Sequence, residues 1–252
     1  MTSRRSATFP PAAVEWLAGR EPARVLDVGS GDGRLAQSLV GRGHTVTCID
    51  SNPDKVRRLA DLVPDALTCV AKAEALPLRS FRFDVVTVQE SLTQFAPGLA
   101  LSEFARVLRT GGYLAVVFTS RDDTVPWVKR LARRIQEDDP TAMVGDYGRE
   151  TLAALADSDY FPVVEARAFR HWLPITRAGL LAMVRRRPTL AKLPEDRLNG
   201  LLADVGEMYD SLAKSPDPLL LPYQADCRRL QVDHGDLTMP IHEDGLRISV
   251  RF

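Results

Sequence analysis

The feature of this sequence that most constrains its fold is a turn near the N-terminus with three glycines at alternate positions. The turn, Gly-Ser-Gly-Asp-Gly at 29–33, follows an expected buried strand at 24–28 and leads into a helical pattern at 32–40. Glycine tolerates positive φ and lets a bound group approach the backbone closely. A buried strand, such a turn and a helix in this order predict the first unit of a parallel α/β sheet, with a ligand at the turn.

The same alternation of short apolar runs and amphipathic stretches continues through the first half of the chain. Further strands are expected at 45–49, 66–70, 83–88 and 113–118, and further helices at 53–62 and 99–109. Gly111 and Gly112 are expected to interrupt the chain before the fifth strand. Strands that alternate with helices indicate βαβ units, right-handed crossovers and a mostly parallel sheet with helices on both faces.

The second half of the chain changes character. We expect helices at 125–135, 149–156, 177–186 and 194–213, long β-rich runs at 161–172 and 219–230, and a turn at 243–245. The chain is interpreted as one domain over 1–252, in which 10–120 forms the ligand-binding core and 121–231 lies on the substrate side. The helices at 177–213 would be an insertion between the last two strands, beside the substrate pocket. The tail at 232–252 is left unassigned.

The charge balance and the cysteines narrow the class of protein. Lys plus Arg and Asp plus Glu number 33 each, so the net charge is zero, whereas a dedicated nucleic-acid-binding protein is usually basic. No apolar run approaches the roughly 18–20 residues of a membrane helix. The cysteines Cys48, Cys69 and Cys227 form no close-spaced pair. We therefore expect no nucleic-acid or membrane partner, no metal site, and a location in the reducing cytoplasm.

The residues around the glycine turn discriminate between ligands. A dinucleotide-binding turn reads Gly-x-Gly-x-x-Gly, and here Arg34 stands where the third glycine would be. Asp27 and Asp32 bracket the turn, and their negative charge would repel a pyrophosphate. Carboxylates instead suit a ligand with an ammonium and a sulfonium group, which describes S-adenosylmethionine. Asp50, at the end of the second expected strand, can accept hydrogen bonds from both ribose hydroxyls of that ligand.

Five blocks of sequence then occur in a familiar order. The blocks are 25–35, Asp50, 73–78, 83–86 and 107–114. Together they resemble the class I S-adenosylmethionine-dependent methyltransferases, near the ubiquinone-biosynthesis and trans-aconitate types of the small-molecule branch. The resemblance implies a doubly wound, Rossmann-like α/β sheet of seven strands in the order 3-2-1-4-5-7-6, with strand seven antiparallel.

The resemblance also implies which residues would hold S-adenosylmethionine. They are Asp27, Gly29, Ser30, Gly31 and Gly33 for the methionine end, Asp50 for the ribose, Ser51 beside the adenosine, Ala73 and Glu74 at the adenine, and Gln89 at the methyl group. Two departures limit what can be carried over. Lys72 stands where family members often carry an acid that meets the adenine. Residues 93–95 read Thr-Gln-Phe where the trans-aconitate type tends to have a His-Trp pair.

The catalytic chemistry depends on the methyl acceptor, which the sequence leaves open. A carboxylate acceptor has no proton to lose, whereas a hydroxyl or a carbon acid needs a general base. Candidates for that base are Glu90, His171 and Tyr223, and none of them is assigned the role. The arginines at 185–187 either complement the end of a helix or bind an anionic substrate. We expect a small-molecule acceptor such as a carboxylic acid or a hydroxyl-bearing metabolite, with the oligomeric state left open.

Two other functions are compatible with the same fold. One is an NAD(P)-dependent oxidoreductase, which the early third glycine and the acids at the turn disfavour. The other is a non-catalytic nucleotide-binding protein that keeps the fold. The intact turn at 29–33 and Asp50 argue against lost cofactor binding, though not against lost chemistry.

Overall fold

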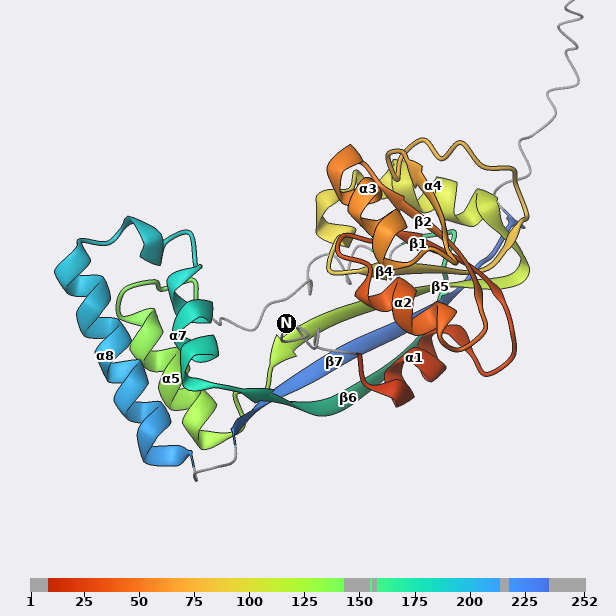
Figure 1. Ribbon diagram of the computed structural model, residues 1–252. Helices are drawn as coiled ribbons and strands as arrows, with labels where there is room; N and C mark the ends of the chain where they lie inside the picture. The colour runs from red at the N-terminus through yellow and green to blue at the C-terminus, as the bar shows by residue number, and fades with distance from the viewer. Residues whose placement is uncertain (1–8, 143–154, 156–157, 214–217, 236–252) are drawn as a thin grey trace, which may run out of the picture.

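The computed structural model describes residues 9–142, 155, 158–213 and 218–235, which form a seven-stranded sheet with helices on both faces (Figure 1). The strands are β1 (Arg24–Val28), β2 (Thr45–Asp50), β3 (Leu67–Val70), β4 (Phe83–Gln89), β5 (Leu108–Arg121), β6 (Val163–Ile175) and β7 (Leu219–Gln231). Their order in the sheet is β3-β2-β1-β4-β5-β7-β6. β1 to β5 pair in parallel, and β7 runs antiparallel to both of its neighbours. The predicted fold class and strand order are confirmed.

Several helices begin where a proline fixes the first turn. The helices are α1 (Pro11–Ala18), α2 (Arg34–Val40), α3 (Pro53–Leu62), α4 (Pro97–Val107), α5 (Pro126–Gln136), α7 (Arg177–Arg185) and α8 (Glu195–Leu212), with 3₁₀ turns η1 (Leu92–Gln94) and η2 (Leu190–Lys192). Proline suits the first helical position because its fixed φ is already helical and the amide it lacks has no partner there. α4 therefore starts at Pro97, two residues before the expected start.

Two hydrophobic cores lie on opposite faces of the sheet. One packs buried residues of α4 against Leu26 and Val28 of β1 and against the central strands. The other packs α1, α2 and α3 against the opposite face, where Val25 is fully buried. Because both faces are covered, β1 is buried at four consecutive positions, 25–28, rather than at alternate ones.

The glycine pair before the fifth strand does not interrupt it, contrary to the sequence-based expectation. β5 runs through Gly111 and Gly112, but its pairing with β4 jumps from Phe83↔Leu108 to Val85↔Tyr113. Gly111 has φ +77, and a Cβ at Gly112 would lie 3.0 Å from the carbonyl oxygen of Asp84. The glycines thus form a bulge inside a long strand, which a local sequence pattern does not distinguish from a break.

A third hydrophobic core forms a helical lobe, defined here as α5, α7, η2 and α8 with the adjoining ends of β6 and β7. Figure 1 shows this lobe beyond the far ends of β5, β6 and β7, apart from the helices that flank the sheet. Along the sequence, α7 and α8 come between β6 and β7, as the predicted insertion requires. Arg187 forms a 2.8 Å ion pair with buried Asp139 just after α5, which ties the lobe together.

Some of the expectations fall on residues that are not described. The expected helix at 149–156 lies outside the described residues except for Leu155, which is buried in the core beside α4. The turn at 243–245 also lies outside them. The first tail residues are described, and the Val232 amide donates to the Gly112 carbonyl at 3.2 Å.

Among the described helices, none combines the length and the apolar character needed to cross a membrane. The single domain over 1–252 stays a prediction.

Leu131 tests whether the helical lobe is a separate cooperative unit. Its side chain is fully buried within the lobe core. Leu131→Ala should lower the free energy of unfolding by about 2–5 kcal/mol, because it leaves a cavity in a packed core. Hydrogen exchange should speed up at amides of α5, α7 and α8 more than in β1 and β4. The control Lys129→Ala, at an exposed position of the same helix, should leave the free energy of unfolding and the exchange rates unchanged. An equal loss of protection in the sheet of Leu131→Ala would contradict a separate cooperative unit.

Candidate functional site

A cavity of about 770 Å³ opens at the carboxyl ends of the first four strands. Its walls are the segments 28–32, 49–52, 71–74, 89–91 and 94–96, together with Lys55. β1 lies between β2 and β4, and the chain leaves β1 in one direction along the sheet and returns on the other side. Ligands of open α/β sheets bind at such a reversal of strand order.

Most of the residues implied by the resemblance line this cavity. Those that do are Gly29, Ser30, Gly31, Asp50, Ser51, Ala73, Glu74 and Gln89. Asp27 and Gly33 do not, because Asp27 is buried within β1 and Gly33 caps the start of α2. They lie beneath and beside the turn, and their predicted role at the methionine end stays a prediction.

The three glycines of the turn are required for three different reasons. All have positive φ: +69 at Gly29, +56 at Gly31 and +73 at Gly33. A Cβ at Gly29 would collide with the hydroxyl oxygen of Ser91, and one at Gly33 would collide with a methyl carbon of Leu59. A Cβ at Gly31 would meet nothing closer than 3.7 Å. Gly31 therefore keeps the cavity side of the turn open, whereas the other two allow close packing.

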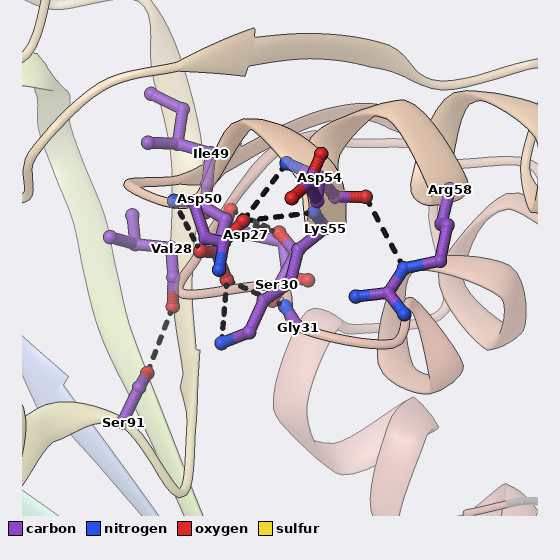
Figure 2. Close-up of polar contacts among 11 residues, drawn as sticks. Asp27, Val28, Ser30, Gly31, Ile49, Asp50, Asp54, Lys55, Arg58 and Ser91 are labelled. Atoms are coloured by element: carbon purple, nitrogen blue, oxygen red, sulfur yellow. Dashed lines mark hydrogen bonds and ion pairs between the residues drawn. The ribbon is translucent and has the colours of Figure 1, made fainter.

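Asp50 links the glycine turn to the start of α3 (Figure 2). Its carboxylate accepts the Gly31 amide at 3.1 Å through Oδ2 and the Asn52 amide at 2.9 Å through Oδ1. The Lys55 ammonium lies 3.6 Å from Oδ2. The carboxylate is largely buried yet borders the cavity, so a ligand there meets a fixed negative charge.

Asp27 is a buried carboxylate with one oxygen left unpaired. Oδ1 accepts the Thr87 hydroxyl at 2.7 Å, whereas Oδ2 is buried and has no hydrogen-bond partner within the described residues. Burial raises the pKa of Asp27 to about 6, and the hydrogen bond from Thr87 only partly opposes this. Keeping the Asp27 carboxylate charged beneath the turn therefore costs free energy. A cation bound nearby would reduce this cost, because it favours the charged form.

The wall at 71–74 is positioned mainly through its backbone. The Ala71 amide donates to the Asp50 carbonyl at 3.2 Å, and the Ala73 side chain is buried in the core beside α4. Glu74 accepts the Ala96 amide at 2.9 Å, so its side chain joins this wall to the start of α4. Lys72 lines the cavity in the place of the acid that the resemblance would supply.

Sequence reasoning does not select Ser91 and Asn52, which shape the cavity. The Ser91 hydroxyl packs over Gly29 and donates to the Val28 carbonyl at 3.2 Å (Figure 2). The Asn52 side chain caps α3 by accepting the Asp54 amide at 2.9 Å. An Asn-Pro pair at a helix start is a recognisable capping signal, whereas nothing in the sequence indicates that Ser91 lies over the turn.

The three candidates for a general base are separated by the structure. Glu90 lines the cavity. His171 and Tyr223 do not, and they stack on each other with ring centroids 5.4 Å apart where β6 pairs with β7.

No described residue of the helical lobe lines the cavity, so the arginines at 185–187 are not part of this site. Within the described residues, no group of three or more His, Cys, Asp or Glu is placed to hold a metal ion.

Comparison with known proteins identifies the family. Residues 26–116 match a methyltransferase domain family. An uncharacterized methyltransferase of Mycobacterium tuberculosis is 31% identical over 233 residues, which cover 90% of each chain. The chain belongs to the methyltransferase family. This methyltransferase also matches a malonyl-[acyl-carrier protein] O-methyltransferase of Geobacter sulfurreducens, at 41% identity over 104 residues, which cover 38% of this chain and 39% of that protein.

Solved structures show that the fold is shared. A putative type II methyltransferase from Anaeromyxobacter dehalogenans has a TM-score of 0.66 and 21% identity, with 89% of this chain and 97% of that chain covered.

A further partial relative by sequence is the ubiquinone/menaquinone biosynthesis C-methyltransferase of a Ruegeria species, 33% identical over 115 residues. These 115 residues cover 42% of this methyltransferase and 46% of that enzyme.

The raised pKa of Asp27 makes a testable contribution to stability. The folded protein holds this proton more tightly than the unfolded chain, whose aspartates have a pKa near 3.8. The group therefore stabilises the ligand-free fold below about pH 4, and this contribution is lost as the pH rises through about 6. Asp27→Asn should remove a fall on the order of 2 kcal/mol in the free energy of unfolding between pH 4 and pH 7.

Urea unfolding at several pH values measures this effect. The control Asp32→Asn removes an exposed carboxylate of the same turn and should keep the wild-type pH dependence. An Asp27→Asn profile parallel to that of the wild type would show that Asp27 titrates alike in the folded and unfolded states.

Proposed function

We propose that this protein is an S-adenosylmethionine-dependent methyltransferase whose methyl acceptor is a small molecule. The observation that carries the proposal is the Asp50 carboxylate, fixed by the Gly31 amide at the wall of the 770 Å³ cavity. A carboxylate at this place suits two adjacent ribose hydroxyls, which donate hydrogen bonds to a charged acceptor.

The other residues around the cavity fit the same ligand. Gly31 leaves room for close approach to the turn, and the buried, unpaired oxygen of Asp27 favours a cationic group above it. Residues 71–74 line the cavity just after β3, where the adenine would lie. When bound, S-adenosylmethionine supplies a methyl group activated by its sulfonium. The chain's own contribution is to fix the ligand and to align the acceptor.

The cavity volume is within the range of roughly 300–1,000 Å³ that is usual for small-ligand sites, as the proposed cofactor requires. One further observation favours a small-molecule acceptor. The zero net charge lacks the basic character of nucleic-acid enzymes. The names of two partial relatives refer to a malonyl-[acyl-carrier protein] and to ubiquinone/menaquinone biosynthesis, and both names denote methyl transfer. An NAD(P)-dependent oxidoreductase is not favoured, because the relatives are methyltransferases.

Asp50→Ala should weaken the binding of S-adenosylhomocysteine by roughly 1.5–3 kcal/mol, the scale of a hydrogen bond to a charged group. The wild-type dissociation constant is expected in the micromolar range. The substitution should also lower the free energy of unfolding by about 1–2 kcal/mol, because the Gly31 and Asn52 amides lose their acceptor. Titration calorimetry and urea unfolding measure the two effects separately.

Asp54→Ala is the matched control for Asp50→Ala. Asp54 is an exposed carboxylate on the first turn of α3, and it pairs with Arg57 rather than lining the cavity. Its removal should leave ligand affinity unchanged. Unaltered affinity in a folded Asp50→Ala protein would contradict the ribose assignment, and wild-type binding of NAD in preference to S-adenosylhomocysteine would overturn the proposed cofactor.

The acceptor class is tested by radiolabel transfer from S-adenosylmethionine to a panel of metabolites, tRNA, ribosomal RNA and cell protein. The panel should contain matched pairs in which one scaffold carries either a carboxylic acid or a hydroxyl group. We expect label in at least one metabolite and at a higher rate than in any polymer. Faster labelling of RNA or protein than of every metabolite would contradict a small-molecule acceptor.

A further inference from the structure

Glu90 has a backbone conformation that is unusual for a residue with a side chain. It follows directly after β4, lines the cavity and has φ +57, in the left-handed region. Among the described non-glycine residues only Phe81 shares this property. Such conformations are strained and persist where the surroundings hold the residue in place, often at functional sites.

Two contacts with β5 hold Glu90 in this position. Its amide donates to the Val117 carbonyl at 3.1 Å, and its Oε1 accepts the Thr119 amide. The Thr119 side chain also forms a hydrogen bond with the carboxyl group. The carboxylate is thus anchored to the neighbouring strand, while its side chain stays open to the cavity.

The position of Glu90 in the cavity favours a role at the transferred methyl group. Asp50 and residues 71–74 form the end of the cavity at β2 and β3, whereas Glu90 lies at the β4 end, beside β5. A ligand with its ribose on Asp50 and its adenine at 71–74 directs its remaining part toward β4. The acceptor would then reach it from the side of β5.

The charge environment of Glu90 also suits proton acceptance. Its side chain is open to the cavity, yet the protein around it partly desolvates the carboxyl group and raises its pKa, despite the hydrogen bond from Thr119. The other charged side chains that line the cavity are Asp32, Asp50, Lys55, Lys72 and Glu74. None of these described residues forms an ion pair with Glu90, and the facing strand presents the neutral Thr119. A carboxylate whose pKa moves toward neutrality is a more effective proton acceptor.

We propose that Glu90 accepts the proton that the methyl acceptor loses, and that the acceptor is therefore a hydroxyl or a carbon acid rather than a carboxylate. The acceptor atom forms a bond to the methyl carbon, and the carbon–sulfur bond of the sulfonium breaks with its electron pair moving to sulfur. The proton moves from the acceptor atom to the carboxylate of Glu90. Net charge is conserved, because a cation and a carboxylate become a neutral thioether and a carboxylic acid.

This inference rests on the proposed function, and its first test needs no knowledge of the acceptor. When glutamate is labelled with ¹³C at its side-chain carboxyl carbon, NMR can follow the protonation of each glutamate as the pH changes. The signal that is missing in Glu90→Gln belongs to Glu90. Titrations are recorded for the free protein, with S-adenosylmethionine and with S-adenosylhomocysteine. The two ligands differ by the methyl group and the positive charge at sulfur.

A proton acceptor beside the sulfonium should titrate at a lower pH with S-adenosylmethionine than with S-adenosylhomocysteine, because the cation favours the carboxylate. By the same coupling, Glu90→Gln should reduce the preference for S-adenosylmethionine over S-adenosylhomocysteine by about threefold or more. It should leave the affinity for S-adenosylhomocysteine within about twofold. The control Glu21→Gln, at an exposed position, should change neither.

Equal titration of Glu90 with the two ligands, and an unchanged preference in Glu90→Gln, would overturn the inference and leave the proposed function intact. Failure of the wild-type protein to bind either ligand would instead contradict the proposed function. The side-chain amide introduced by Glu90→Gln can still accept the hydrogen bond from the Thr119 amide through its oxygen. A purely structural role would therefore survive the substitution.

The second test uses the matched acid and hydroxyl acceptors of the labelling panel. Label should enter hydroxyl or carbon-acid members, and Glu90→Gln should lower kcat for these by about 100-fold or more with little change in KM. The acidic limb of the wild-type pH profile of kcat should be absent in the variant. Labelling of carboxylic acids alone, or a kcat in Glu90→Gln within about threefold of the wild type, would contradict the proposed role.

Discussion

The turn between β1 and α2 has to pass the loop after β4 and helix α3 at van der Waals distance, and this constraint determines where a ligand can lie. Gly29 leaves the space that the Ser91 hydroxyl fills, and Gly33 leaves the space that Leu59 fills. Gly31 then remains as the position where the backbone faces open space, and its amide is fixed on Asp50. The cavity exists because close packing on both sides holds the turn open in its middle.

Two acids at this site, buried Asp27 and cavity-lining Glu90, are held in ways that do not favour the ligand-free protein. Asp27 has an unpaired buried oxygen and a pKa raised to about 6 by desolvation, and Glu90 has a strained backbone and a raised pKa. A cationic ligand would offset the cost of keeping the two carboxyl groups charged, because a nearby positive charge favours the carboxylate form. The same arrangement that lowers the stability of the empty site thus contributes to recognition. This is the usual relation between stability and function at binding sites.

Much of the fold and the cofactor end of the site could be predicted from the sequence, because they depend on local patterns. Apolar strands, the glycine turn and Asp50 at a strand end each follow from residues close in sequence. The bulge at Gly111, the packing of Ser91 over Gly29 and the ion pair of Arg187 with Asp139 could not be predicted. They depend on contacts between distant segments, which no periodicity records. The sequence makes Glu90 a candidate, but its backbone conformation, which suggests a role, is visible only in the structure.

The central claim is that the cavity at the ends of β1 to β4 is a cofactor site organised by Asp50. A crystal structure of the protein with S-adenosylhomocysteine tests it most directly. The account predicts the two ribose hydroxyls on the Asp50 carboxylate, the adenine beside residues 71–74 and the sulfur at the end of the cavity near Glu90. A ligand bound elsewhere, bound in the reverse orientation, or absent from crystals grown at saturating concentration would contradict it.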